Sequence, residues 1–279
     1  MPVNAVIIVG GPSTVTDFRP LSLYQPKPLF PIAGRPLIYH HLKALAALPD
    51  LQEVFLVGYY EASQFTAFME EVRQELKIKI RYLREFEALG TGGGLYHFRD
   101  QIQRGEPDSI IFMHMDVCCT FPLPDLLAFH RQQQLLNNGK VVGSILSTRV
   151  PKDVAKNFGC MIVDPESRQV RHYVEKPETN VSDLISCGIY VFSNLIFEEV
   201  RRVVLESELK YKKHCDHLRV LIINLFSGDR KMLILSCWKG KFWVHSHVNH
   251  HLHFSLTKPV ISGVKSSQPV PLSMPIDFI

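Results

Sequence analysis

The sequence predicts an α/β domain built on a mixed, mainly parallel sheet, and two observations lead to that prediction. Up to about residue 147, short apolar runs alternate with longer segments whose apolar residues recur at spacings of three and four. After Lys140 the pattern changes to short strand-like runs joined by loops. The first pattern is typical of a doubly wound sheet with helices on both faces, and the second adds a more antiparallel half.

The apolar runs of the first part predict four strands separated by helices. The strands are expected at Ala5–Val9, Glu53–Val57, Ile78–Leu83 and Ser109–Met113. The helices are expected at Pro36–Leu48, Glu61–Leu76, Gly94–Ile102 and Asp125–Leu136. In such sheets, ligands bind beyond the carboxyl ends of the strands, so the loops that follow these strands are where a site is expected.

The second part predicts further strands, one more helix and an irregular tail. The strands are expected at Val141–Ser147, Cys160–Val163, Gln169–Val174, Ile189–Phe192 and Lys231–Ser236. A helix capped by Ser193 is expected to run to about Val204. We expect one domain over residues 1–245 and an irregular tail over 246–279, because the end of the chain carries four prolines and no sustained periodicity.

Composition restricts the classes of function. The 279 residues are 46% hydrophobic, with 31 basic and 27 acidic residues and a net charge of +4. This charge suits an anionic small molecule and is too weak for a general nucleic-acid surface. No uncharged apolar stretch reaches the length of about 18 residues that a membrane span needs, and the apolar start is too short for a signal peptide. A cytoplasmic protein is therefore expected.

A glycine turn after the first strand is the first candidate site. Gly10 and Gly11 would let backbone N–H groups approach phosphate oxygens, because no Cβ stands in the way. Lys27, between two prolines, would fix a cation on a stiff loop nearby. The alternative interpretation is an ordinary structural turn.

A second glycine cluster follows the third strand. Gly90, Thr91, Gly92, Gly93 and Gly94 precede a helix, and so many glycines suggest that a ligand approaches the backbone closely. A flat base stacked on this segment would fit. The alternative is a flexible surface loop.

Charged residues mark two further candidate positions. Asp116 comes just after the fourth strand, where a carboxylate can hold Mg²⁺ that bridges phosphates; the alternative is a turn or N-cap aspartate. Glu175 and Lys176 follow a later strand and would pair an acceptor for sugar hydroxyls with a cation for a phosphate. Their alternative is an exposed ion pair.

Taken in order, these segments resemble the sugar-1-phosphate nucleotidyltransferases. The resemblance is carried by V-I-I-V-G-G-P, F-R-P-L-S, P-K-P-L-F-P-I-A-G-R-P-L-I, L-G-T-G-G-G-L-Y-H-F-R-D, M-D-V-C-C-T-F-P, H-Y-V-E-K-P-E-T and S-D-L-I-S-C-G-I-Y-V-F-S. It is continuous from residue 3 to about 205, and it is strongest to the alpha-type subunits of mannose-1-phosphate guanylyltransferase.

The resemblance implies a fold and a role for each candidate residue. The fold would be a Rossmann-like three-layer nucleotidyltransferase domain of the GT-A-like type. Gly10, Gly11 and Lys27 would hold the nucleotide phosphates, Gly90–Gly94 would meet the guanine, and Asp116 would be a Mg²⁺ ligand. A second group, Gly159, Glu175 and Lys176, would face mannose-1-phosphate. The family reaction is in-line attack of the sugar phosphate on the α-phosphate of GTP, which releases pyrophosphate and GDP-mannose.

Departures from the family pattern bear on activity. The stretch between Gly11 and Arg19 is two residues longer than in active members, Val15 replaces a loop glycine, and Asp17 replaces the catalytic arginine. His245 stands where active members carry a second metal aspartate, which weakens the expected Mg²⁺ site. Alpha-type subunits share the longer loop and the missing aspartate. They also carry a C-terminal β-helix of hexapeptide repeats, and no such repeat is seen here.

Three interpretations follow. The leading one is a subunit that binds GDP-mannose or GTP and regulates a catalytic guanylyltransferase subunit, with weak turnover or none. The second is an active guanylyltransferase. The third is a truncated product without function.

Overall fold

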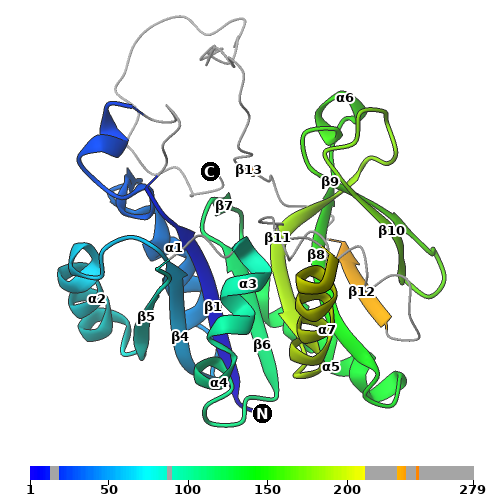
Figure 1. Cartoon of the computed structure of the whole chain (residues 1–279), viewed down its shortest axis with the longest axis horizontal. Coiled ribbons are helices and arrows are strands. Elements are labelled where there is room, and N and C mark those ends of the chain that lie inside the picture. The colour runs from blue at the N-terminus through cyan, green and yellow to red at the C-terminus, as the bar shows by residue number, and fades with distance from the viewer. Residues whose placement is uncertain (13–18, 87–89, 211–230, 237–242, 245–279) are drawn as a thin grey trace, which may run out of the picture.

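A nine-stranded mixed sheet forms the centre of the molecule (Figure 1). The computed structural model describes residues 1–12, 19–86, 90–210, 231–236 and 243–244. Along the sheet the strand order is β10-β9-β11-β6-β1-β4-β5, and β8 pairs with both β11 and β12. The predicted α/β architecture is confirmed.

The first half of the sheet is parallel. It consists of β1 (Val3–Gly10), β4 (Leu51–Gly58), β5 (Ile80–Arg84) and β6 (Ser109–His114). β1 lies between β4 and β6, and its Val6 is in register with Phe55 on one side and Phe112 on the other. The carboxyl ends of these four strands therefore meet at one edge of the sheet.

The second half is largely antiparallel. It consists of β8 (Val141–Arg149), β9 (Gly159–Val163), β10 (Val170–Glu175), β11 (Leu184–Phe192) and β12 (Lys231–Ser236). β11 joins the two halves, since it runs antiparallel to β6, β8 and β9. Only β12 runs parallel to its neighbour in this half, β8. Two short ribbons complete the strands, β2 (Pro31–Ile32) with β3 (Arg35–Pro36) and β7 (Val117–Cys118) with β13 (Trp243–Val244).

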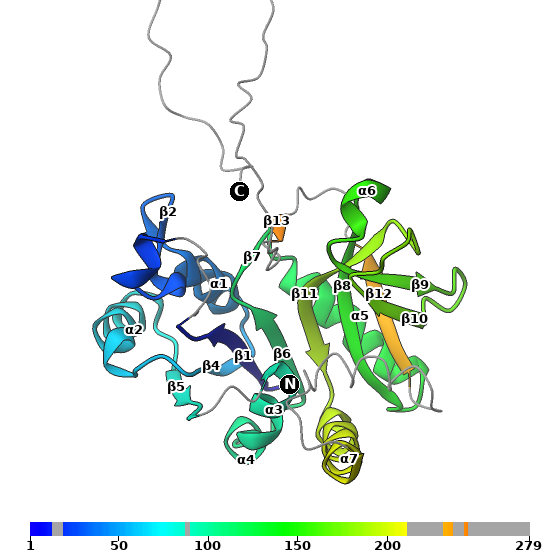
Figure 2. The ribbon, with the colours of Figure 1, turned by 45° about the horizontal axis from the view of Figure 1, so that its top comes forward.

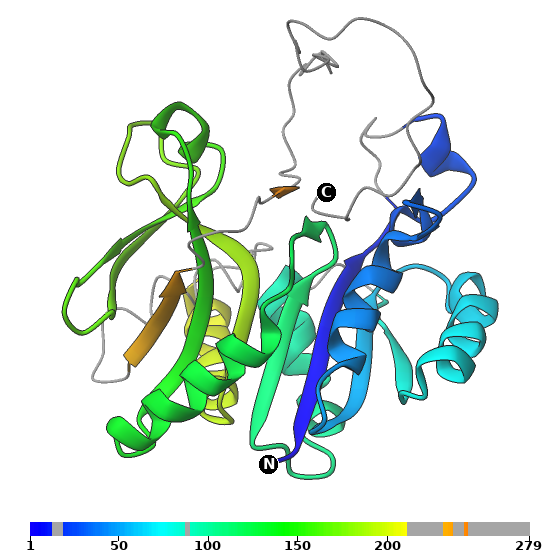
Figure 3. The same cartoon turned by 180° about the vertical axis from the view of Figure 1, so that it is seen from behind.

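Helices cover both faces of the sheet because alternate strand residues point to opposite sides. On one face, Ala5, Ile7 and Val9 of β1 pack with α1 (Leu37–Ala46), α2 (Ser63–Leu76) and α5 (Leu123–Leu136). On the other face, Val6 packs with α3 (Gly90–His97), α4 (Arg99–Ile102) and α7 (Leu195–Lys210). Figure 1 shows α3 and α7 in front of the sheet, and Figure 3 shows α1 and α5 on the opposite side.

Most helix boundaries lie within two residues of the sequence prediction, and two helices differ in a way that has a structural consequence. The helix expected at Gly94–Ile102 begins earlier, at Gly90, and is divided into α3 and α4 around Phe98. The helix expected to be capped by Ser193 begins at Leu195, so Ser193 lies one residue before the cap position. The Ser193 hydroxyl donates instead to the carbonyl of Val141, at 2.9 Å, which ties the start of α7 to β8.

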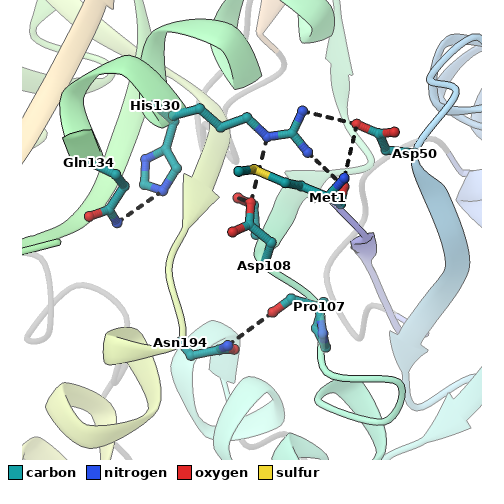
Figure 4. A network of polar contacts seen from close by, with 9 residues as sticks. Met1, Asp50, Pro107, Asp108, His130, Gln134 and Asn194 are labelled. Atoms are coloured by element: carbon teal, nitrogen blue, oxygen red, sulfur yellow. Dashed lines mark hydrogen bonds and ion pairs between the residues drawn. The ribbon is translucent and has the colours of Figure 1, made fainter.

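A network of charged groups connects the amino ends of the parallel strands, at the edge of the sheet opposite the loops that carry the candidate site (Figure 4). Arg131 of α5 donates to the carboxylate of Asp50 at 3.0 Å and to the carbonyl of Met1 at 2.7 Å. Its Nε lies 3.6 Å from a carboxylate oxygen of Asp108. One side chain therefore links α5 to the segments that precede β1, β4 and β6.

The predicted tail over residues 246–279 lies outside the described residues, so it stays a prediction. Within the part of the chain that the structure describes, no helix has the length and apolar character needed to cross a bilayer.

A buried histidine next to this network predicts a loss of stability in acid. His130 is 1% exposed, its Nδ1 lies 3.0 Å from the Ser144 hydroxyl, and burial lowers its pKa to about 4. In the unfolded chain this imidazole binds a proton with a pKa near 6.5, whereas in the folded chain it stays neutral until the pH approaches 4. The free energy of unfolding therefore falls as the pH drops from about 6.5 towards 4. The contribution of this group is roughly 3 kcal/mol over that interval.

His130→Gln removes this proton uptake, so its free energy of unfolding is expected to depend less steeply on pH in that window. Urea titrations between pH 7 and 4 measure the effect. The matched control is His172→Gln, because His172 lies on the exposed side of β10. Equal slopes for wild type and His130→Gln would contradict the assignment.

Candidate functional site

The carboxyl ends of β1, β4 and β5 are joined by two backbone hydrogen bonds. The N–H of Tyr59 donates to the carbonyl of Gly10 at 2.9 Å, and the N–H of Glu85 donates to the carbonyl of Gly58 at 2.8 Å. These bonds continue the parallel ladder beyond the ends of the strands. The loops that follow β1, β4 and β5 are therefore connected at their first residues by main-chain hydrogen bonds alone.

The two glycines of the first turn have different roles. Gly10 has a φ of +69°, which favours glycine, and no atom of the described residues lies within 4 Å of where its Cβ would be. A Cβ on Gly11, by contrast, would overlap the ring of Tyr59. Among the described residues there is open space on the Cβ side of Gly10, whereas the space beside Gly11 is filled by Tyr59. Val15 and Asp17, which the sequence analysis singled out, lie outside the described residues.

Lys27 begins a short 3-10 turn that is anchored on both sides. This turn, η2 (Lys27–Leu29), follows another 3-10 turn, η1 (Leu21–Leu23), and lies beside β2 (Figure 2). Pro28 and Leu29 are buried, and the side chain of Gln25 donates to the Leu29 carbonyl at 2.7 Å. Lys27 therefore begins a turn whose next two residues are buried.

The second glycine cluster lies in the first turns of α3, not in a loop. A Cβ on Gly94 would overlap a carboxylate oxygen of Glu85 and would crowd Val57. Close packing of α3 on the ends of β4 and β5 therefore explains at least one of the glycines. The helix backbone at Gly90, Thr91, Gly92 and Gly93 follows directly after residues 87–89, which are not described.

Glu85 is a further candidate site residue, and it was not predicted from the sequence. It follows β5, is 7% exposed, and contacts Gly94 of α3. Burial raises the pKa of its carboxyl to about 7. A carboxyl whose pKa lies near neutrality in a loop cluster is a candidate functional group. The available signal was an acidic residue directly after an apolar strand and five positions before the glycine cluster.

Asp116 lies in the turn between β6 and β7, and it is half-buried. Beneath it, His41 of α1 is fully buried, and burial lowers the pKa of this imidazole to about 4, although the charge of Asp116 acts in the opposite direction. His41 is therefore neutral near pH 7. Among the described residues, no group of three or more His, Cys, Asp or Glu side chains could hold a metal ion. His245 lies outside them.

The three residues predicted to face the sugar phosphate lie together, Gly159 at the start of β9, Glu175 at the end of β10 and Lys176 directly after it. Gly159 and Glu175 are cross-strand partners, and Lys176 N–H donates to the Phe158 carbonyl at 3.1 Å. The Tyr173 hydroxyl donates to Glu175 at 2.6 Å and occupies the space that a Cβ on Gly159 would need. These residues belong to the second half of the sheet and are separated from β6 by β11.

The comparisons with known proteins agree with this geometry. The profile of the family described as nucleotidyl transferase matches residues 4–226, which is most of the chain. The chain belongs to this family. A solved structure titled as a putative glucose-1-phosphate thymidylyltransferase from Bacillus anthracis in complex with a sucrose aligns with a TM-score of 0.65. That alignment covers 86% of this chain and 88% of the other at 16% identity, so it shows the fold alone.

Curated relatives are more similar in sequence. A probable mannose-1-phosphate guanyltransferase of Schizosaccharomyces pombe is 49% identical over 201 residues, which are 71% of this chain and 47% of that protein. A human mannose-1-phosphate guanylyltransferase regulatory subunit alpha is 46% identical over 201 residues, 72% of this chain and 46% of that protein. The Xenopus tropicalis regulatory subunit alpha is 42% identical over 245 residues, 87% of this chain and 56% of that protein. The chain spans about half the length of these relatives.

The contact between Gly11 and Tyr59 predicts a rescue. Gly11→Ala places a methyl group against the Tyr59 ring, and overpacking of this kind costs about 1–3 kcal/mol. The melting temperature of Gly11→Ala is expected to fall below that of the wild type. In a Tyr59→Ala background, Gly11→Ala is expected to lower the melting temperature by less, because the ring that the methyl group would meet is gone. Gly58→Ala is the contrasting control, because its methyl group would meet the backbone carbonyl of Gly10, which no side-chain change can move. If the losses in melting temperature of Gly11→Ala and Tyr59→Ala simply add in the double variant, the contact between Gly11 and Tyr59 would be contradicted.

Proposed function

We propose that this chain is a mannose-1-phosphate guanylyltransferase alpha-like subunit that binds GDP-mannose or GTP and regulates a catalytic subunit. Its own turnover is weak or absent. The observation that carries the proposal is the similarity, at 42–46% identity, to proteins named as regulatory subunit alpha. The ladder at the strand ends supports it, because it links the glycine turn at Gly10 to the segment that carries the buried carboxyl of Glu85.

In this proposal the first half of the sheet binds the nucleotide. The backbone at Gly10 and the cation of Lys27 hold the phosphates, and the buried carboxyl of Glu85 selects the base. A carboxylate can accept hydrogen bonds from both N1–H and the N2 amino group of guanine. Uracil and thymine offer one N–H between two carbonyl oxygens, so the second carboxylate oxygen would face an acceptor. The sequence analysis left the choice of base to family resemblance, and Glu85 supplies a physical reason for guanine.

The second half of the sheet binds the sugar phosphate. Glu175 accepts hydrogen bonds from sugar hydroxyls, and Tyr173 orients its carboxylate. Lys176 supplies a cation for the phosphate. Gly159 has no side chain, and this leaves the room that the Tyr173 hydroxyl occupies next to Glu175.

A Mg²⁺ ion fits Asp116 only in part. Mg²⁺ is commonly held by one or two carboxylates together with substrate phosphates and water. Asp116 can supply one such carboxylate, next to a neutral His41 that does not compete for the charge. The ion would neutralise phosphate charge, and in this proposal it enters with the nucleotide.

Asp17 is the reason for weak turnover. By resemblance, an arginine at this place stabilises the phosphate charge in the transition state, and an aspartate repels it. A unit charge about 4 Å away contributes about 4 kcal/mol at an effective dielectric constant of about 20. A loss of that size corresponds to a rate lower by about a thousandfold.

An assay of binding and turnover together tests the proposed function. With GTP, mannose-1-phosphate and Mg²⁺, the chain is expected to bind GDP-mannose with negligible release of pyrophosphate. Asp17→Arg is expected to tighten GTP binding, because it replaces repulsion by attraction. Turnover at ordinary enzyme rates that is lost in Asp116→Asn would contradict the regulatory role and support an active enzyme. A melting temperature that no nucleotide changes would support the truncated, non-functional product.

Glu85 predicts how nucleotide-sugar binding depends on pH. Guanine N–H groups bind the ionised carboxylate, so the affinity for GDP-mannose is expected to rise as the pH increases from 6 to 8, through the pKa of about 7. GDP-mannose suits the measurement because its diphosphate lacks the terminal phosphate group whose pKa is about 6. Glu85→Gln is expected to weaken binding and to remove the pH dependence. A pH dependence that persists in Glu85→Gln would show that another group titrates.

A further inference from the structure

The strand β11 changes its partners part-way along its length. Its last residues, from Ile189 onward, pair with β6, whereas an earlier part of the strand pairs with β9. Between Ser186 and Tyr190 its register against β8 shifts, which marks a bulge. Gly188 lies in this bulge with a φ of +70°, a left-handed conformation that favours glycine.

Two polar contacts within the strand hold the bulge in shape. The N–H of Gly188 donates to the Ser186 hydroxyl at 3.3 Å, and the same hydroxyl lies 3.1 Å from the hydroxyl of Tyr190. Ser186 and Tyr190 are both buried, and the ring of Tyr190 stacks on that of Phe192 with 5.6 Å between centroids. The position of Gly188 is therefore fixed by the strand that carries it.

The turn that carries Asp116 packs directly on Gly188. A Cβ on this glycine would lie 3.1 Å from a methyl carbon of Val117 and 3.3 Å from Cδ2 of His114. These residues lie on either side of Asp116 in the sequence. On the other side of β6, the backbone of the same turn donates to the Ile8 carbonyl of β1 at 3.2 Å. The turn is therefore held between β1 and β11.

We infer that Gly188 is a positioning residue for the Asp116 carboxylate, and that its contact with the turn makes this carboxylate selective for Mg²⁺ over Ca²⁺. Gly188 touches neither the ion nor the nucleotide and acts through Val117. The inference rests on the proposed function, because it concerns the ion that Asp116 is proposed to hold with the nucleotide.

The physical reason is that the two ions differ in the geometry they accept. Mg²⁺ demands near-ideal octahedral coordination, whereas Ca²⁺ accepts more ligands at longer and more variable distances. A methyl group at Gly188 would be closer to Val117 than an ordinary van der Waals contact, so the side chain would have to move by a few tenths of an ångström. A shift of that size next to Asp116 disfavours Mg²⁺ more than Ca²⁺.

Calorimetric titration of the full chain with GTP in Mg²⁺, in Ca²⁺ and in EDTA tests the inference. Wild-type chain is expected to bind GTP more tightly in Mg²⁺ than in Ca²⁺. Gly188→Ala is expected to lower the ratio of these two affinities about three- to tenfold. The affinity in EDTA is expected to stay unchanged, because it depends on Gly10 and Lys27 and not on the ion.

Matched variants separate the contact from backbone strain. Gly139→Ala introduces similar strain, at a φ of +74°, but no described atom lies within 4 Å of its Cβ, so the preference for Mg²⁺ is expected to stay. Val117→Ala makes room for the methyl group, so Gly188→Ala is expected to have a smaller effect in that background. If Gly188→Ala does not fold, Val117→Ile crowds the same contact without changing the glycine and is expected to lower the same ratio.

The outcomes separate this inference from the proposed function. An unchanged ratio in Gly188→Ala or in Val117→Ile, or the same loss in Gly139→Ala, would overturn the inference and leave the proposed function intact. Equal GTP affinity of the wild type in Mg²⁺ and in Ca²⁺ would do the same. A wild-type chain that binds no GTP under any of these conditions would overturn the proposed function and this inference with it.

Discussion

Two backbone hydrogen bonds at the carboxyl ends of β1, β4 and β5 determine where the site can form. They join Tyr59 to Gly10 and Glu85 to Gly58. Because they involve only main-chain groups, they follow from the strand register and not from the choice of side chains. The glycine turn, Tyr59 and the buried carboxyl all depend on this connection, and α3 then packs against it through Gly94.

The rest of the fold keeps this edge rigid. β1 is buried along most of its length between two layers of helices, and its side chains alternate between the two cores. At the opposite end, Arg131 links the segments before three strands. The loops of the site therefore extend from strands that are held at both ends. A rigid platform of this kind reduces the entropy that is lost when a nucleotide binds.

Much of this arrangement could be predicted from the sequence, because it rests on local patterns. The strands and most helices were found from periodicity, although β1, β4 and β11 are longer than predicted and β5 begins two residues later. Gly10 and Lys27 were identified from residue types alone, and the structure gives each a consistent geometry. Gly159, Glu175 and Lys176 were expected to act together, and the pairing of β9 with β10 brings them together.

What the sequence could not show depends on contacts between distant segments. Glycines disfavour a helix, yet α3 begins at Gly90, and tight packing on Glu85 and Val57 is the tertiary contact that favours it there. Glu85 itself was missed, since its raised pKa arises from burial beneath α3 and not from neighbours in the sequence. The dependence of Gly11 on Tyr59 joins residues 48 positions apart, and no local pattern reveals it.

In the proposed function, the nucleotide site binds more than it catalyses. By resemblance, the chain keeps the phosphate-binding glycines and lysine, whereas Asp17 replaces the catalytic arginine and His245 the second metal aspartate. Such a site is suited to sensing GDP-mannose and passing that information to a catalytic subunit. The proposed regulatory role therefore depends on GDP-mannose binding at the carboxyl edge of the sheet.

Hydrogen–deuterium exchange with and without GDP-mannose tests that claim most directly. We expect slower exchange in peptides that contain Gly10, Lys27, Tyr59 and Gly93, and in the peptide that contains Glu175. Peptides around Arg131, at the opposite end of the sheet, are expected to stay unchanged. Protection confined to other segments, or none at saturating GDP-mannose, would contradict the placement of the site.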